Sequence, residues 1–407
     1  MSASIQTETQ VAEVDIAIVG GAMTGATLAL GLARLAAKGR PLSIALIEAQ
    51  APGEAHPGFD ARSIAIAQGS IFELRRLGLW PLLAELGTKI SNIHISDRGH
   101  LGMTELNASQ FHLDALGQVV ELERVGRVLF DALRHSRVQL HCPAKLTGVA
   151  PEADGHLLTL DNQQRLRARL VVAADGIHSP VRQSLGQPLT QIDFGQTALV
   201  ANIITDKPHE SWAFERFTAT GPLALLPMGD SQGQARLSLV WALEAGQAAM
   251  LKSAPKAEFL QALQQAFGYR AGRFVDVGSR HSYPLCLSYM PRPIFHRCVF
   301  IGNAAQTLHP IAGQGFNLGL RDLVCLLEVL EEALARGQDI GAAATLHSYL
   351  ALRETDRRET ITNIEFLVRG FSNQHWPLVA GRSLGLRLLS WFPPLKLPVA
   401  RKAMGWR

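Results

Sequence analysis

Cysteine is scarce in this 407-residue chain, and its four cysteines stand far apart with no C-x-x-C spacing. This scarcity excludes a disulfide framework and a zinc site of the usual spacing, so the thiols are expected to be reduced and no metal is expected. No uninterrupted apolar run approaches the roughly 18 residues that a membrane-spanning helix needs. Residues 1–12 are polar, with neither a basic start nor an apolar centre, and are expected to be a lead-in and not a secretory signal.

Strong charge of either sign is also missing, since the net charge is only +4 and no dense Lys/Arg run occurs. A nucleic-acid-binding surface is therefore not expected. With 47% hydrophobic residues, the mild basicity fits contact with an anionic membrane surface, and it fits ordinary surface charge equally well. The sequence predicts a cytoplasmic enzyme of about two or three domains, with peripheral contact at the inner membrane left open.

A glycine-bearing turn stands near the start of the chain, between an apolar strand predicted at 14–19 and a helix predicted at 26–35. Such a turn lets the backbone approach a pyrophosphate, whose charge lies against the N–H groups at the helix start. The residues of the turn are Gly20, Gly21, Ala22, Met23, Thr24 and Gly25. Ala22 departs from the G-x-G-x-x-G pattern, because it places a methyl group where the middle glycine stands.

A second strand predicted at 43–47 ends at Glu48, about 20 residues beyond the turn, where a carboxylate can accept hydrogen bonds from a ribose. A tight strand-to-helix connection without any nucleotide is the simpler alternative for the glycine turn alone. Strand, turn, helix and Glu48 together favour a nucleotide-binding unit.

Two later segments repeat this arrangement. The apolar strand at 169–174 ends at Asp175-Gly176, which by itself is also common turn chemistry. The strand at 298–301 leads into Gly302-Asn303, and Gly313-Gln314-Gly315 then opens a helix that carries Asn317. The start of that helix is expected to face a flavin ring, so the three segments together indicate a bound flavin.

Between these segments, residues 187–275 contain strand-like stretches at 198–204 and 235–241, which indicate an antiparallel sheet. The expected fold is α/β (α+β overall), with a Rossmann-like FAD-binding domain interleaved with an antiparallel-sheet substrate domain and followed by C-terminal helices. The expected boundaries are 1–85 with 115–186 and 276–360 for the FAD-binding domain, 86–114 with 187–275 for the substrate domain, and 361–407 for the helices.

The C-terminal residues predict amphipathic helices at 364–369 and 383–389, interrupted at 391–394 by Trp-Phe-Pro-Pro. Two alternatives stay open for this segment: it docks against the enzyme, or it contacts lipid or a partner protein. Both can hold at different ends of the segment.

The order and spacing of the three segments resemble the flavin aromatic hydroxylases related to p-hydroxybenzoate hydroxylase. More narrowly, four stretches are similar to the 2-octaprenyl-6-methoxyphenyl hydroxylase family of ubiquinone synthesis, and the resemblance spans essentially the whole chain. The stretches are residues 56–62 (HPGFDAR), 93–100 (IHISDRGH), 214–217 (FERF) and 302–310 (GNAAQTLHP).

The resemblance implies a role for each matching residue. The turn from Gly20 to Gly25 would hold the pyrophosphate of FAD, and Glu48 the adenosine ribose. The other implied cofactor-binding residues are Arg62 and Arg124 along the cofactor, Asp175 and Gly176 at the second turn, Asn303 at the ribityl and phosphate groups, and Gly313, Gln314, Gly315 and Asn317 near the flavin pyrimidine. Most of the wider family has Asp at the position of Asn303, and an amide lacks that charge, so altered flavin binding is expected.

The implied activity is hydroxylation of a polyprenylated methoxyphenol with NAD(P)H and O2. In such enzymes NAD(P)H reduces the flavin, O2 adds at C4a, and the distal oxygen of the hydroperoxide attacks the electron-rich ring. His309 and Pro310 are the implied catalytic residues in the flavin-facing loop. His309 is either a base for the phenol hydroxyl or a hydrogen-bonding residue of the loop.

Other functions share this scaffold. A sister hydroxylase acting on another ring carbon, a flavin reductase acting on a prenyl lipid, and a non-catalytic flavin-binding member of a lipid-biosynthetic complex stay open, and other ubiquinone-synthesis proteins are candidate partners. A flavin halogenase is disfavoured, because those enzymes resemble one another in a Trp-x-Trp-x-Ile-Pro segment and no two of the six tryptophans stand two residues apart.

Overall fold

The computed structural model describes residues 11–37, 39, 41–53, 56, 58, 62–231, 233–309 and 313–371, together with 381, 384–385, 387–388, 391 and 393–406. Its helices are α1 (Met23–Ala37), α2 (Gln68–Arg76), α3 (Trp80–Leu83), α4 (Leu122–Arg134), α5 (Pro180–Ser184), α6 (Ala245–Ser253), α7 (Lys256–Phe267), α8 (Gln314–Ala335), α9 (Ala343–Phe371) and α11 (Pro393–Ala403), with short 3₁₀ turns η1 (Ala84–Leu86), η2 (Ala108–Phe111) and η3 (Gly302–Ala304).

The strands form three sheets. The strands are β1 (Val11–Val19), β2 (Ile44–Ile47), β3 (Ser63–Ala67), β4 (Gly87–Ile90), β5 (Asn92–Asp97), β6 (Met103–Asn107), β7 (Gly117–Glu121), β8 (Gln139–His141), β9 (Leu146–Glu152), β10 (Gly155–Leu160), β11 (Arg165–Ala173), β12 (Thr190–Thr205), β13 (Trp212–Phe217), β14 (Pro222–Ser231), β15 (Gln234–Glu244), β16 (Phe274–Val277), β17 (His281–Tyr289), β18 (Ile294–Phe295), β19 (Cys298–Phe300) and β20 (Gln306–Thr307).

The first sheet carries a parallel core in the order β8-β2-β1-β11-β19. The C-terminal halves of β1 and β11, and the whole of β2, are apolar and buried, as parallel strands covered on both faces must be. One face packs against α1, α4 and α8, and the other against α5 and the β9–β10 hairpin. The strands and helix expected around the first glycine turn are confirmed.

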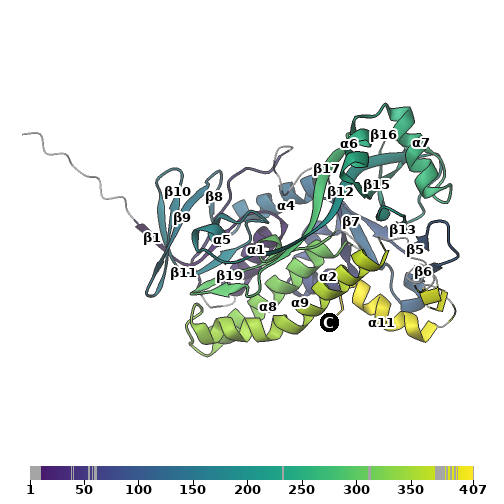
Figure 1. The fold of residues 1–407 in the computed structure, drawn as a ribbon. Coiled ribbons are helices and arrows are strands. Elements are labelled where there is room, and N and C mark those ends of the chain that lie inside the picture. The colour runs from purple at the N-terminus through teal and green to yellow at the C-terminus, as the bar shows by residue number, and fades with distance from the viewer. Residues whose placement is uncertain are drawn as a thin grey trace, which may run out of the picture.

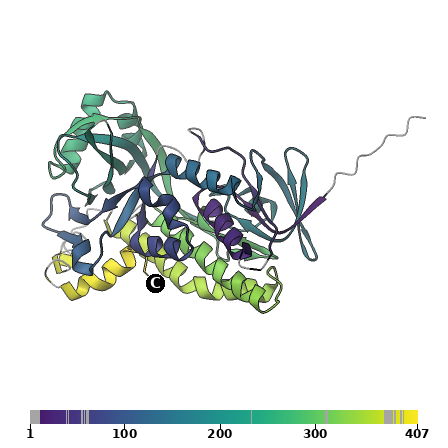
Figure 2. The same cartoon turned by 180° about the vertical axis from the view of Figure 1, so that it is seen from behind.

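The second sheet is mostly antiparallel and runs β20-β17-β12-β15-β14-β13-β5-β6, with β16 paired to β12. The stretches expected at 198–204 and 235–241 lie in β12 and β15, which pair with each other. Helices α6 and α7 cover one face of this sheet through a core that includes Leu239, Trp241 and Phe259. Figures 1 and 2 show, from opposite sides, that the two large sheets occupy opposite ends of the molecule.

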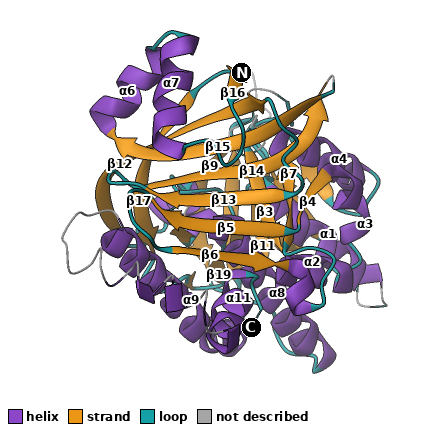
Figure 3. Cartoon of the chain, turned by 90° about the vertical axis from the view of Figure 1, so that its right-hand side faces the viewer, coloured by secondary structure: helices purple, strands orange, loops and turns teal. Residues whose placement is uncertain are grey.

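A small antiparallel sheet, β3-β7-β4, lies against the other face of the second sheet. Its contact is a small apolar cluster in which Ile90, Val119 and Ala213 are buried and Ala65 and Leu226 pack against them. In Figure 3 this small sheet lies behind the strands β13 and β14. The α/β fold expected from the sequence, with a parallel nucleotide-binding sheet, an antiparallel sheet and C-terminal helices, is confirmed.

Two expected domain boundaries do not coincide with the ends of elements. Strand β17 pairs along β12 as far as Tyr289, so the antiparallel sheet extends beyond residue 275. Helix α9 runs without interruption through residue 360, because its apolar residues Ile361, Ile364 and Val368 keep packing against Leu287 and Leu318.

The C-terminal helix α11 docks on the body of the protein. Ala400 and Met404 are buried against Leu106 and Leu116 of the antiparallel half. The helix begins at Pro393. A proline is tolerated there because the N–H group that it lacks would have no partner within the helix. Of the helix expected at 383–389, residues 384–385 and 387–388 are described, and they are helical. Among the helices that the structure describes, none combines the length and apolar content that crossing a bilayer requires.

Candidate active site

The three glycine-bearing segments meet at the carboxyl edge of the parallel sheet. Gly20 has a φ of +99°, and a β-carbon there would lie 2.5 Å from the carbonyl oxygen of Ala174. A β-carbon on Gly25 would lie 1.8 Å from the carbonyl oxygen of Gly20, and one on Gly302 would lie 3.0 Å from Oγ1 of Thr24. Segments more than 120 residues apart therefore contact each other at glycine positions, where the β-carbon of any other residue would clash with a neighbouring atom.

Glu48 lies directly beside the first turn. Its Oε2 accepts a hydrogen bond from the backbone N–H of Gly21 at 2.5 Å, and its Oε1 accepts one from that of Gln50 at 2.9 Å. Burial alone would raise the pKa of Glu48, but the hydrogen bonds from His56, Gln50 and Gly21 outweigh it and hold that pKa below its ordinary value. The carboxylate is thus charged, and it stands where an adenosine ribose is expected.

The residues between the glycines of the first turn are placed differently. Ala22 and Thr24 are partly exposed, whereas Gly21 and Met23 are buried. The methyl group of Ala22 points toward Gly58, because a β-carbon on Gly58 would lie 2.6 Å from it. Helix α1 begins at Met23, and Ala26 already donates its N–H to the carbonyl of Ala22.

Asp175, at the second turn, lies at the start of the short helix α5, whose N-cap is Ser179. Its Oδ2 accepts a hydrogen bond from the N–H of Val181 at 3.1 Å, while its Oδ1 is buried with no partner. Burial raises the pKa of Asp175 to about 6, against the opposing effects of Ser179 and Val181. Gly176 has a φ of +83°, a left-handed conformation that favours glycine. Arg182, which the sequence did not single out, donates to the carbonyl of Ala304 at 3.0 Å and so joins the second segment to the third.

The third turn, at Gly302, is fixed by the buried carboxylate of Asp322. Oδ2 of Asp322 accepts hydrogen bonds from the N–H of Gly302 at 3.1 Å and from Nε2 of Gln306 at 2.6 Å. Oδ1 of the same residue accepts two from the guanidinium of Arg353, at 2.7 and 2.9 Å. Asp322 is 1% exposed and Arg353 is 2% exposed, so this pair is fully buried between α8 and α9.

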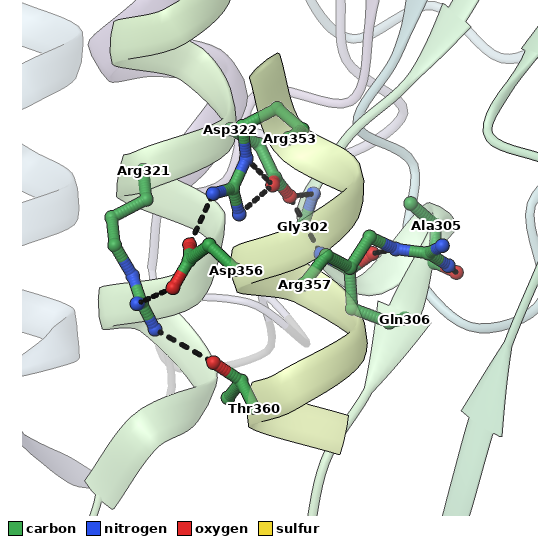
Figure 4. A network of polar contacts seen from close by, with 9 residues as sticks. All are labelled: Gly302, Ala305, Gln306, Arg321, Asp322, Arg353, Asp356, Arg357 and Thr360. Carbon is green, nitrogen blue, oxygen red and sulfur yellow. Dashed lines mark hydrogen bonds and ion pairs between the residues drawn. The ribbon is translucent and has the colours of Figure 1, made fainter. Parts of the chain in front are cut away.

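Figure 4 shows how the network continues. Arg353 and Arg321 both bond Asp356, and Arg357 donates to Oε1 of Gln306 at 2.7 Å. Burial alone would lower the pKa of Arg353, but the carboxylates of Asp322 and Asp356 raise it above its ordinary value. The turn at Gly302 is therefore fixed by charged side chains from two helices.

The start of α8 is tied to the small sheet. Gly313 precedes the helix with a φ of +61°, and Asn317 donates to the carbonyls of Gly313 and Ala65 at 2.7 and 3.0 Å. Asn317 also accepts hydrogen bonds from Ala67 and Ser70, so its amide is fully used within the protein. Gln314 is buried and Gly315 is partly exposed. Asn303, in contrast, is exposed beside Gly302.

His309 is fully buried. Its Nε2 lies 3.1 Å from Oε1 of Gln196 and its ring packs edge-on against Phe194, while its Nδ1 has no partner. Burial lowers the pKa of His309 to about 4, so the imidazole is neutral at physiological pH and is a weak base. Pro310 lies outside the described residues.

The two arginines expected along the cofactor lie in different settings. Arg62 immediately precedes β3, and its guanidinium lies 4.9 Å from the ring centre of Tyr283 in the antiparallel sheet. The side chain of Arg124 is 50% exposed on α4, 3.9 Å from Glu121. Arg62 therefore stands between the two halves of the protein, whereas Arg124 is on the surface of a helix.

The antiparallel sheet turns a largely apolar face toward the small sheet. On β14, Ala224 and Leu226 are partly exposed on this face, whereas Leu223 and Leu225 are buried in the core on the other side. Glu215 on β13 shares the face with Ala213. The structure thus brings a carboxylate to an apolar surface, and this residue was not among the expected site residues.

Comparison with known proteins agrees with this geometry. The family described as "FAD binding domain" matches residues 13–362. The chain belongs to this family. A curated relative of this FAD-binding protein is the ubiquinone hydroxylase UbiL of Rhodospirillum rubrum, 36% identical over 96% of this chain and 89% of the relative. Another is the 3-demethoxyubiquinol 3-hydroxylase of Escherichia coli, 29% identical over 96% of this chain and 98% of the relative.

A solved structure with the same fold is that of Klebsiella pneumoniae HpxO complexed with FAD and uric acid, with a TM-score of 0.74 and 18% identity over 96% of this chain and 97% of that one. The chain is accordingly an FAD-dependent monooxygenase. Its own residues fit FAD, since the glycine positions of the first turn, Gly20, Gly21 and Gly25, leave no room for β-carbons. Glu48 offers carboxylate acceptors beside this turn, and Oδ1 of Asp175 is buried without a partner.

Proposed function

We propose that this chain hydroxylates the ring of a polyprenylated methoxyphenol in ubiquinone biosynthesis, with NAD(P)H as electron donor. The observation that carries the proposal is the meeting of three distant glycine segments beside an apolar sheet face that bears the carboxyl group of Glu215. The names of the two curated relatives support it, since both describe hydroxylases of ubiquinone or its precursors.

In this proposal the first turn binds the pyrophosphate through its N–H groups and the dipole of α1. Glu48 accepts hydrogen bonds from the adenosine ribose, and Asn303 offers an uncharged amide to the ribityl and phosphate groups. Gly313, Gln314 and Gly315 direct the N–H groups of α8 at the flavin pyrimidine. When bound, FAD supplies the redox chemistry, accepting a hydride from the nicotinamide and activating O2.

We propose that His309 orients the loop that continues into Pro310 and does not take up the phenol proton. A histidine with a pKa near 4 accepts protons poorly from a phenol, whose pKa is near 10. The hydrogen bond to Gln196 and the contact with Phe194 give it a structural task instead. His309 and Pro310 would then both act by shaping the space over the flavin.

The prenyl tail needs an apolar surface, which Ala224, Leu226 and their neighbours on the sheet provide. We further propose a domain division close to the expected one, with residues 276–289 moved to the substrate domain because β17 pairs with β12. Arg62 would lie at the boundary between these two domains.

We propose that the C-terminal part also contacts a membrane. Leu384, Trp391 and Leu397 are exposed, and the guanidinium of Arg387 lies 5.6 Å from the ring centre of Trp391 and donates to the carbonyl of Leu101, itself 73% exposed. Apolar side chains next to cations match the boundary of an anionic bilayer. Such contact would deliver a lipid-soluble substrate.

A sister hydroxylase that acts on another ring carbon is the second candidate. The relative from Escherichia coli, named for a 3-hydroxylase reaction on a demethoxyubiquinol, directly favours it. A non-catalytic flavin-binding role rests on Ala22 and Asn303 alone, the two departures from the usual pattern.

The test combines oxygen uptake with product analysis. Purified protein reconstituted with FAD is supplied with NADPH and a 2-methoxyphenol carrying one isoprene unit. The proposal predicts that oxygen is consumed in equal amount to the ring-hydroxylated product formed. In a separate experiment, mass spectrometry of the quinone precursor that accumulates on gene deletion identifies the ring position. Reduction of bound flavin with no hydroxylated product from any prenylated phenol would contradict it.

A further inference from the structure

Glu215 is a partly exposed residue with a buried carboxyl oxygen that the fold does not use. It lies on β13, and its Oε1 is buried with no hydrogen-bond partner among the described residues. Its neighbours in register are Ala224 on β14 and Ile95 on β5, both apolar. Arg216, next in sequence, points to the opposite face because side chains alternate along a strand. A carboxylate in such a place costs free energy unless a ligand supplies the missing hydrogen bond.

The face on which Glu215 lies leads to the start of α8 at Gly313. Ala213, two residues and so about 7 Å along the same strand, is buried in the cluster against which Ala65 packs. Ala65 in turn touches the start of α8, since its carbonyl accepts a hydrogen bond from Asn317 and a β-carbon on Gly313 would lie 3.3 Å from its own. In Figure 3, β13 lies between β14 and β5 in the sheet that faces this region.

The surroundings of Glu215 fit an apolar ligand with one polar group. Four apolar side chains on this face are partly exposed: Ala224, Leu226, Ile95 and Val240. Their strand neighbours Leu225 and Leu239 belong to the core on the opposite side of the sheet. A ligand seated beside Glu215 would meet the aliphatic side chains of Ala224 and Ile95 together with the carboxyl group of Glu215. That pattern matches a phenol with a hydrocarbon tail better than a charged or sugar-like compound.

We infer that Glu215 binds the ring hydroxyl of the phenolic substrate and takes up its proton as the ring is hydroxylated. The inference rests on the proposed function. In this step the O–H bond of the phenol breaks, an O–H bond forms at Oε1 of Glu215, and the electron pair stays on the phenol oxygen, where it makes the ring more nucleophilic. The proton returns to the product oxygen or to water before the next turnover.

The charge state of Glu215 suits this task. Burial raises its pKa to about 7, so the carboxyl group is a stronger base than an ordinary glutamate and is about half ionised at neutral pH. The charged groups that neighbouring elements bring to this face are Asp97 on β5, the pair of Glu121 and Arg236 between β7 and β15, and Arg62 over Tyr283. Burial is the sole cause of the shift, so none of these groups offsets it.

The experiment compares Glu215→Gln with the wild type and with Glu258→Gln, the same change at an exposed position of α7. All three are reconstituted with FAD and given the one-isoprene methoxyphenol. Glu215→Gln is expected to lower the rate of ring hydroxylation about 100-fold and to remove an inflection near pH 7 in the pH profile of kcat/KM. Its FAD affinity and its rate of flavin reduction by NADPH are expected to equal those of the control.

Glu215→Asp keeps the carboxyl group and is expected to restore part of the rate together with a pH inflection, which a merely structural role would not predict. Wild-type hydroxylation and an unchanged pH profile in Glu215→Gln would overturn the inference while leaving the proposed function intact. A wild-type protein that binds FAD but neither hydroxylates the phenol nor shows a difference spectrum with it would instead overturn the proposed function and, with it, this role of Glu215.

Discussion

The buried pair of Asp322 and Arg353 links the stability of the protein to the turn at Gly302. Replacing Arg353 with Met removes the guanidinium that contacts Oδ1 of Asp322 at 2.7 and 2.9 Å and keeps an unbranched side chain of similar length. Asp322, 1% exposed, then keeps its bonds to Gly302 and Gln306 but loses its direct cation. The change therefore acts on both folding and the turn at Gly302.

Removing one partner of a buried ion pair costs about 3–5 kcal/mol of unfolding free energy. Unfolding entropy amounts to about 2.1 cal/mol/K per residue, so for a chain of 407 residues this cost corresponds to a melting temperature about 4–6 °C lower. Loosening of the Gly302 turn is expected to weaken FAD binding about tenfold, or about 1.4 kcal/mol.

The assay is thermal unfolding of the apo-protein, followed by titration with FAD. The matched control is Arg336→Met, which breaks a bridge to Glu332 whose side chains are 63% and 60% exposed. Such a surface bridge contributes about 0–1 kcal/mol, so the control is expected to melt within about 1 °C of the wild type. If Arg353→Met melts with the control and binds FAD with wild-type affinity, the reasoning about this network is wrong.

Three further predictions follow from other parts of the structure. Gly25→Ala is expected to abolish FAD binding at micromolar concentrations in a fluorescence titration, because its β-carbon would lie 1.8 Å from a backbone oxygen. The control Gly246→Ala has open space around its β-carbon and is expected to bind FAD as the wild type does. The pKa of His309 is lowered to about 4 in the folded protein, so the unfolded chain takes up the proton first as the pH falls below 6.5. Thermal melts between pH 7.5 and 5 should therefore show that the wild type loses about 2 kcal/mol more unfolding free energy than His309→Gln. Melting curves that shift in parallel would contradict this. Trp391→Ser, at a side chain that is 61% exposed, is expected to weaken co-sedimentation with anionic vesicles about tenfold, and binding unchanged from that of the wild type would count against membrane contact here.

Much of the cofactor half of the protein could be predicted from the sequence, because its signals are local. An apolar strand, a glycine turn and an amphipathic helix follow one another around Gly20, and the same logic located the turns at Asp175 and Gly302. Each is a short-range pattern that burial and backbone geometry impose on neighbouring residues. The resemblance to flavin hydroxylases, which the family comparison confirms, then ordered the three segments into one site.

The supporting contacts could not be predicted in the same way. Asp322 and Arg353 stand 31 residues apart on two helices, and no periodicity pairs them. Arg182 reaches Ala304 across 122 residues. Which residues of a helix meet another helix depends on packing that no local pattern records.

Burial also decided what the sequence left open. Glu215 and Arg216 are adjacent charges in an apolar strand and lie on opposite faces, so the sequence alone does not tell which of the two faces the substrate side. His309 could be named from its place beside Pro310, but its low pKa follows from burial against Phe194 and Gln196. The continuous helix α9 likewise follows from apolar contacts made after residue 360.

The most direct test of the central claim, that three distant segments form one FAD site, is hydrogen exchange of the apo-protein with and without FAD. One equivalent of FAD is expected to slow amide exchange together at residues 20–25, at 175–176, and at 302–303 with 313–315, while the exposed helix face around Glu258 is unchanged. Protection of the first segment alone, or of none of the three, would contradict the account.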